Sequence, residues 1–72
     1  MNADLFRATT KKYMELRHIP TKERLRAHTT IGSQHTFLKY WKDPDLMPMG
    51  VWDQIMTCLN VPYEERFEIL KK

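Results

Sequence analysis

The sequence predicts one all-α domain that spans residues 1–72, and three observations lead to that prediction. The chain has 72 residues, enough for one small hydrophobic core and too few for two. Apolar side chains recur at intervals of three and four residues in several segments, and no segment alternates convincingly at period two. The four prolines and two glycines stand between these segments and mark their boundaries. Five short helices are therefore expected.

The first helix is expected over residues 4–17, where a stripe of mostly apolar side chains has helical spacing. The stripe consists of Leu5, Phe6, Thr9, Tyr13 and Leu16. Pro20 ends this helix, because the residue before a proline avoids the α region. Thr21 then offers a side-chain oxygen to the free amides of a second helix, expected over residues 22–28.

A turn follows at residues 29–33, in which Gly32 permits a positive φ and Ser33 provides a second N-cap. The third helix is expected over residues 34–41. Its polar side chains cluster at the beginning, and its apolar side chains are Phe37, Leu38, Tyr40 and Trp41. It is therefore a short helix with a polar leading end.

The Asp-Pro segment around Pro44 favours a loop over residues 42–48. A fourth helix is expected over residues 49–59, with a buried face of Val51, Trp52, Ile55, Met56 and Leu59. Asn60 suits its end, and Pro62 suits the first position of the fifth helix. In this last helix, the apolar contacts are expected from Phe67, Ile69 and Leu70.

The net charge of +3 conceals two halves of opposite sign. Residues 1–42 hold nine basic and three acidic side chains, a formal charge of +6, whereas residues 43–72 hold three basic and six acidic ones, a charge of −3. Such an asymmetry favours a polyanionic partner for the N-terminal part and protein or solvent beside the C-terminal part.

Several classes of protein are disfavoured. The lone cysteine, Cys58, excludes an internal disulfide and fits a reducing cytoplasm, where it would be a small buried or half-buried side chain. No signal peptide or membrane-spanning segment is recognisable, so a cytoplasmic protein without membrane contact is expected. No nucleophile has a recognisable partner, and His28, His35 and Cys58 lack metal-site spacing. Neither an enzyme nor a cofactor or metal is expected.

Residues 21–41 have the pattern of a helix-turn-helix: two short helices, a glycine-containing turn, and a second helix that begins with polar side chains. Close approach of the two helices favours a small residue on the inner side of the first, and Ala27 is expected there. Phe37 is expected to fill the core beneath the second helix. The outer side of that helix is then free to enter a major groove about 12 Å wide.

The chain resembles the lambda-repressor-like, or Cro/C1-type, helix-turn-helix family over residues 16–70. The resemblance rests on residues 19–27 (IPTKERLRA), 31–37 (IGSQHTF), 42–48 (KDPDLMP) and 55–62 (IMTCLNVP). The family usually places glycine before the hydrophobic residue of the turn, whereas this chain reads Ile31-Gly32, which predicts a longer or differently wound turn. The resemblance implies a compact five-helix fold, a DNA-binding transcriptional regulator such as a repressor, and an origin in a phage or other mobile element.

On this hypothesis the recognition helix spans residues 33–41 and binds double-stranded DNA. Gln34 is the first candidate for base reading, because its amide can bind N6 and N7 of adenine together, and His35, Thr36 and Lys39 are secondary readers. Lys11 and Lys12 are further candidates for charge neutralisation. The expected phosphate contacts are Thr21, Lys22, Arg24, Arg26, Thr29, Ser33 and Lys42.

Other uses of the same fold stay open. The module could instead bind a phage or host regulatory protein, as a repressor modulator, antirepressor or inhibitor, because fold does not fix function. It could also bend DNA in an excisionase-like architectural role. A homodimer is a further expectation, with Trp52, Phe67 and Leu70 as candidate contacts.

Overall fold

The computed structural model of the protein describes residues 1–71. Within these residues it has five α-helices, one short 3-10 helix and no strand. In chain order they are α1 (Ala3–Leu16), α2 (Lys22–Arg26), α3 (Gln34–Lys42), η1 (Pro44–Leu46), α4 (Met49–Cys58) and α5 (Tyr63–Leu70). The expected all-α class is confirmed, and the predicted helix boundaries agree with the observed ones to within two residues.

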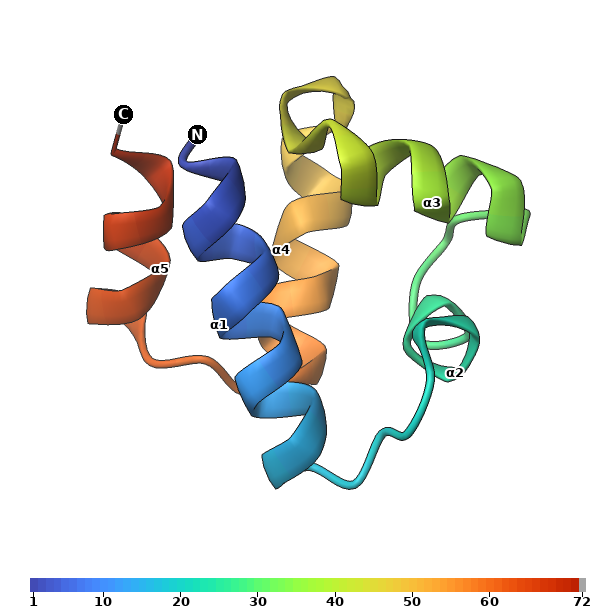
Figure 1. Ribbon diagram of the computed structural model, residues 1–72, viewed down its shortest axis with the longest axis horizontal. Helices are drawn as coiled ribbons and strands as arrows, with labels where there is room; N and C mark the ends of the chain where they lie inside the picture. Colours follow the sequence, from blue (N-terminus) through green and yellow to red (C-terminus); the bar gives the residue numbers. More distant parts are fainter. Residues whose placement is uncertain (72) are drawn as a thin grey trace.

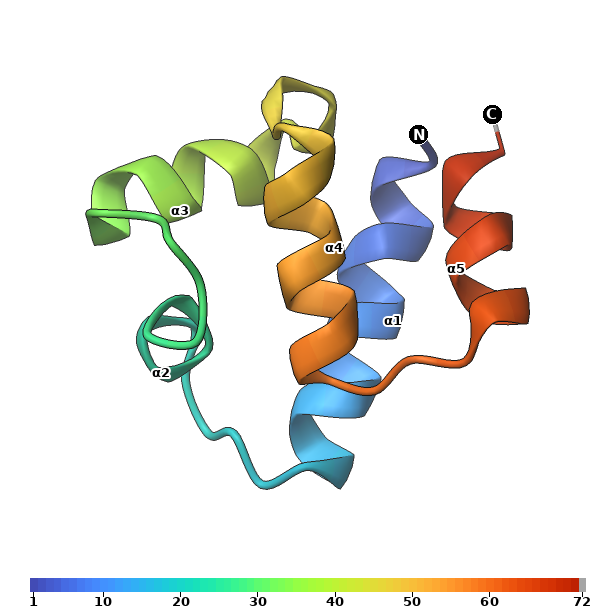
Figure 2. The ribbon, with the colours of Figure 1, turned by 180° about the vertical axis from the view of Figure 1, so that it is seen from behind.

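The helices form two groups (Figures 1 and 2). α1, α4 and α5 run roughly along one direction, whereas α3 crosses over one end of this group and α2 lies below α3. The start of α1 meets the end of α5, where the amide of Asn2 donates to the carbonyl of Ile69 at 2.7 Å. None of the helices within residues 1–71 is long and apolar enough to span a lipid bilayer.

One hydrophobic core joins the two groups. Leu25 of α2, Ile31 of the following segment and Phe37 of α3 belong to the same buried cluster as the apolar faces of α1, α4 and α5. The remaining buried apolar members are Phe6, Tyr13, Met14, Met47, Trp52, Ile55, Met56, Leu59, Val61 and Ile69. The predicted position of Phe37 in the core is confirmed, since only 2% of this residue is exposed.

The helix ends are formed by recognisable local sequences. The predicted N-caps are confirmed: the side chains of Thr21 and Ser33 each accept a hydrogen bond from an amide three residues later, at 3.2 Å in both cases. α4 ends with Asn60 in the left-handed region at φ 52°, and α1 ends with His18 at φ 59°. In both, the amide of the left-handed residue and the amide that follows it donate to carbonyls of the last turn, which is the Schellman arrangement.

Two expectations about the segment between α2 and α3 are wrong. Ala27 is exposed, because α2 ends at Arg26 and the fully buried Leu25 fills the inner side instead. Gly32 does not adopt a positive φ. The seven residues 27–33 distribute the change of direction, so no single residue needs a left-handed conformation.

α5 buries less apolar surface than its sequence indicates. Ile69 is fully buried as expected, but Phe67 is 62% exposed and Leu70 lies at the surface. Leu16, at the end of α1, is also exposed. Phe67 and Leu70 point away because Ile69 and Arg66 occupy the inner side of α5.

Hydrogen bonds and an ion pair hold α5 against α1. Glu65 accepts hydrogen bonds from the Tyr13 hydroxyl and, at 3.0 Å, from the Lys12 ammonium. The hydrogen bond from Tyr13 and the bond from Lys12 lower the pKa of the Glu65 carboxyl. The hydrogen bond to Glu65 correspondingly raises the pKa of the Tyr13 hydroxyl.

Arg66 is a buried cation, with only 7% of the residue exposed. Its guanidinium donates to the carbonyls of Val61 at 2.7 Å and Met56 at 3.3 Å, and its Nη1 lies 3.8 Å from Asp53. It therefore satisfies backbone oxygens at the end of α4, which a buried site cannot leave unpaired without a cost in stability.

Candidate nucleic-acid interface

The outer side of α3 carries basic side chains and no acidic ones. His35, Lys39 and Lys42 are exposed and lie on one side of the helix, because they are spaced by four and three residues. Phe37 occupies the opposite, buried side. Within residues 1–71, neither Lys39 nor Lys42 has a side-chain hydrogen bond or an ion pair, so both charges are available to a partner.

Gln34 lies toward the inner side of α3 and is half-buried. Its Oε1 atom is buried and has no hydrogen-bond donor within the described residues. Reading adenine with both amide atoms would require this side chain to turn outward. Among the predicted base readers, His35 and Lys39 are the ones that project from the exposed side, while Thr36 is half-buried at its edge.

The two N-cap hydroxyls are already engaged within the chain. Ser33 accepts a bond from the Thr36 amide and donates to Thr36 Oγ1 at 3.0 Å. Thr21 accepts a bond from the Arg24 amide. Thr21 and Ser33 are exposed at the first turns of α2 and α3, so each can approach a phosphate only while it continues to cap its helix.

Arg26 and Thr29, both predicted to contact phosphates, stabilise the segment between α2 and α3. Arg26 Nη1 donates to the carbonyl of Ile31 at 3.1 Å, and its Nε atom is buried. The Thr29 hydroxyl donates to the carbonyl of Arg26 at 2.7 Å and accepts from the Ile31 amide at 3.2 Å. Gln54 of α4 anchors the same segment by accepting bonds from Thr30. These groups fix the position of α3.

The predicted phosphate contacts on α2 have two different environments. Arg24 is exposed. The Lys22 ammonium lies 4.7 Å from the ring centroid of Trp41, and Lys11 of α1 reaches the same ring at 6.0 Å. Trp41 itself was not among the predicted site residues, because its spacing from Phe37 is also that of an ordinary core aromatic.

Two arginines of the basic N-terminal half bind backbone oxygens at helix ends. Arg7 donates to the carbonyls of Trp41 and Lys42 at 3.0 and 3.3 Å, where α3 ends. Arg17 donates to the carbonyl of Leu59 at 2.9 Å, where α4 ends. Their positive charge complements the negative end of each helix dipole. Two of the positive charges in residues 1–42 therefore bind backbone oxygens within the protein.

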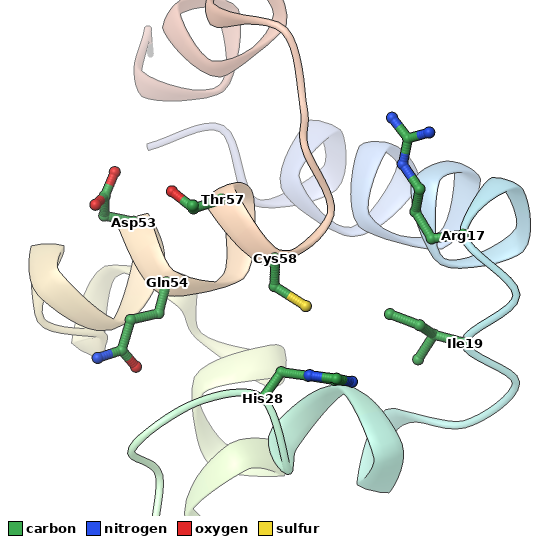
Figure 3. A pocket seen from close by; sticks show the side chains of 7 residues that line it. All are labelled: Arg17, Ile19, His28, Asp53, Gln54, Thr57 and Cys58. Atoms are coloured by element: carbon green, nitrogen blue, oxygen red, sulfur yellow. The ribbon is translucent and has the colours of Figure 1, made fainter.

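An open cleft of about 650 Å³ lies between the end of α1, the end of α2 and α4. Figure 3 shows Ile19, His28 and Cys58 directed toward it, while the Arg17 guanidinium points away. Cys58 is half-buried, as predicted, and burial raises the pKa of its thiol. Among residues 1–71, no group of three His, Cys, Asp or Glu side chains is placed to hold a metal ion.

No protein-family model matches the chain, and no curated protein or solved structure is significantly similar to it.

Proposed function

We propose that the protein is a sequence-specific double-stranded DNA-binding transcriptional regulator of the lambda-repressor-like class. α2 and α3 would form its helix-turn-helix, and α3 would be the recognition helix. The connection of seven residues between them is longer than the three or four residues usual for this motif. The shared core cluster and the hydrogen bonds of Arg26, Thr29 and Gln54 give this longer connection a defined conformation.

The observation that carries the proposal is the outer side of α3. It presents His35, Lys39 and Lys42 without a neighbouring acid on the helix, on an element that crosses the end of the molecule (Figure 1). A helix of nine residues is about 13 Å long, similar to the width of a major groove. A protruding cationic helix supported by a packed core is the geometry that groove binding requires.

His35 and Lys39 become the leading candidates for base contacts on this proposal. A lysine ammonium can donate to O6 and N7 of guanine, and an imidazole offers both a donor and an acceptor to base edges. Lys42 and Arg24 are placed to neutralise phosphates, because both side chains are exposed. Gln34 and Thr36 keep supporting roles at the start of the helix.

Dimerisation is part of the same proposal, and α5 supplies the surface. Tyr63, Phe67 and Leu70 are exposed and follow one side of the helix at intervals of four and three residues. Antiparallel packing of two α5 helices about Phe67 would bring Glu64 of one copy beside Lys71 of the other, so opposite charges flank the apolar contact. The predicted participation of Trp52 is wrong, because this side chain is only 6% exposed.

Phe67→Glu tests the dimer by sedimentation, with Leu16→Glu as the matched control. Both substitutions place a carboxylate at an exposed apolar position, and only the first lies on the proposed contact. The expected result is a dimer for the unchanged protein and the control, and a monomer for Phe67→Glu. If the unchanged protein stays monomeric both alone and with DNA, the proposed dimer is wrong.

A second candidate function is supported by exposed apolar side chains near the end of α3. Leu38 is 46% exposed on α3 itself, and Leu46 and Met49 are exposed in η1 and at the start of α4. Groove binding does not require them, whereas a protein partner could cover them. This observation favours a module that binds a regulatory protein.

Fluorescence anisotropy with a pool of randomised duplexes, at about 50 and 200 mM salt, separates the two functions. A DNA-binding regulator binds more weakly at the higher salt and enriches a short motif after selection. Lys42→Ala should weaken binding to all sequences and reduce the salt slope by about 1, whereas Lys12→Ala on α1 should leave both unchanged. A folded protein that does not bind duplex at the lower salt would contradict the proposal and favour the protein-binding module.

A further inference from the structure

Trp41 is a point at which three helices meet. Its ring stacks on Phe37 of α3 with centroids 6.3 Å apart, and it packs against Phe6 of α1 at 5.9 Å. Two cations also lie beside the ring: Lys11 comes from α1 and Lys22 from α2. The indole is half-buried, so one part of it supports the core and another part remains at the surface.

The two lysines bring positive charge together without an acidic partner. Within residues 1–71, neither Lys11 nor Lys22 takes part in an ion pair. Lys12, the neighbour of Lys11, is different because it bonds to Glu65 at 3.0 Å on the side of α5. Contact with the aromatic ring stabilises each ammonium group, and an anion bound beside the ring would be attracted by both positive charges.

We propose that Lys11 and Lys22, held against Trp41, bind a phosphate of the DNA backbone beside the groove that α3 enters. The inference rests on the proposed DNA-binding function and extends its contact surface from α2 and α3 to α1. An ammonium group is a point charge that suits phosphate, and a half-buried indole is not free to stack on an unpaired base. This contact would therefore orient the protein on the duplex and contribute affinity without reading sequence.

Salt titrations of a selected duplex test the inference with Lys11→Gln, Lys22→Gln and the matched control Lys12→Gln. Each substitution removes one charge, but only the first two remove a cation from Trp41. The expected result is a salt slope reduced by about 1 for Lys11→Gln and for Lys22→Gln, and no change for Lys12→Gln. Lys11→Arg should retain the slope, because it keeps the charge. Melting curves of all variants verify that the fold is intact.

The indole N–H signals provide a second readout that a purely structural role would not change. Trp41 and the buried Trp52 give two such signals, which Trp41→Phe assigns. Addition of the duplex should shift the Trp41 signal and leave the Trp52 signal in place. Normal duplex binding, with unchanged slopes in both lysine variants and an unshifted Trp41 signal, overturns the phosphate contact alone. Failure of the unchanged protein to bind duplex rejects the proposed function as well.

Discussion

The α1–α5 side of the molecule and the α2–α3 side use their charged residues differently. On the α1–α5 side, Lys12 pairs with Glu65, and Arg17 and Arg66 donate to backbone carbonyls at the end of α4. On the α2–α3 side, Lys39 and Lys42 have no such partner within residues 1–71. The formal charge of the N-terminal half is therefore larger than the positive charge that is available to a ligand. Hydrogen bonds and ion pairs inside the fold decide which cations remain available.

The largest expected effect concerns the residue that anchors α3 to the shared core. Phe37→Ala should lower the free energy of unfolding by about 3 to 5 kcal/mol, because it leaves a cavity beneath the helix. Chemical denaturation measures this change, with Leu38→Ala as the control on the exposed side of the same helix. Near-native stability of Phe37→Ala would show that α3 is not seated as described.

A somewhat smaller effect is expected on the α1–α5 side. Arg66→Met keeps much of the side-chain volume but leaves the carbonyls of Val61 and Met56 without their donor, which should cost about 2 to 3 kcal/mol. Arg24→Met is the matched control, because Arg24 is exposed on α2. Equal stability of the two variants would contradict the role of Arg66 at the end of α4.

The next effect distinguishes between the proposed base contacts on the α2–α3 side. His35→Ala should relax the preference at one base pair by about 1 to 3 kcal/mol, as measured by competition between selected and altered duplexes. Gln34→Ala should change this preference less, because the amide oxygen of Gln34 is buried. A loss confined to Gln34→Ala would mean that the side chain turns outward on binding and would restore it as the leading reader.

The smallest expected effect is a pH dependence of stability that arises on the α1–α5 side. The pKa of Glu65 is lowered in the folded protein, so its contribution to stability is present above the unfolded pKa and is lost as the pH falls through the folded pKa. Thermal melting on the acidic side of neutrality should therefore show a decline that is shallower in Glu65→Gln. Tyr13→Phe removes the hydrogen bond that contributes most to the lowered pKa of Glu65, so it should also make the acid decline in stability shallower. If the melting temperature falls equally with pH in all three proteins, the contact of Glu65 with Tyr13 and Lys12 does not stabilise the fold.

The sequence predicts the helices well because their signals are local. Thr21, Ser33 and Asn60 act within one or two turns of their own positions, and the apolar spacing of α4 needs only that segment. The polar partners are less accessible to prediction. Arg66 and Arg17 contact carbonyls of other segments, and nothing in their local sequence distinguishes them from solvated cations.

The candidate site was predictable in part for the same reason. The side of α3 that carries His35 and Lys39 follows from helical spacing once Phe37 is assigned to the core. The positions of Arg26 and Thr29 depend on the fold of the segment that joins α2 and α3, which is longer than the motif predicts. The meeting of Lys11 and Lys22 at Trp41 depends on the packing of three helices.

An amide NMR titration with a selected duplex tests most directly whether α3 is the recognition helix, because it reports on both sides of the molecule in one experiment. We expect the largest shifts at His35 and Lys39 on α3, together with shifts at Thr21 and Arg24 at the start of α2. Shifts that leave α3 unchanged while the duplex is bound would contradict the assignment of α3 as the recognition helix.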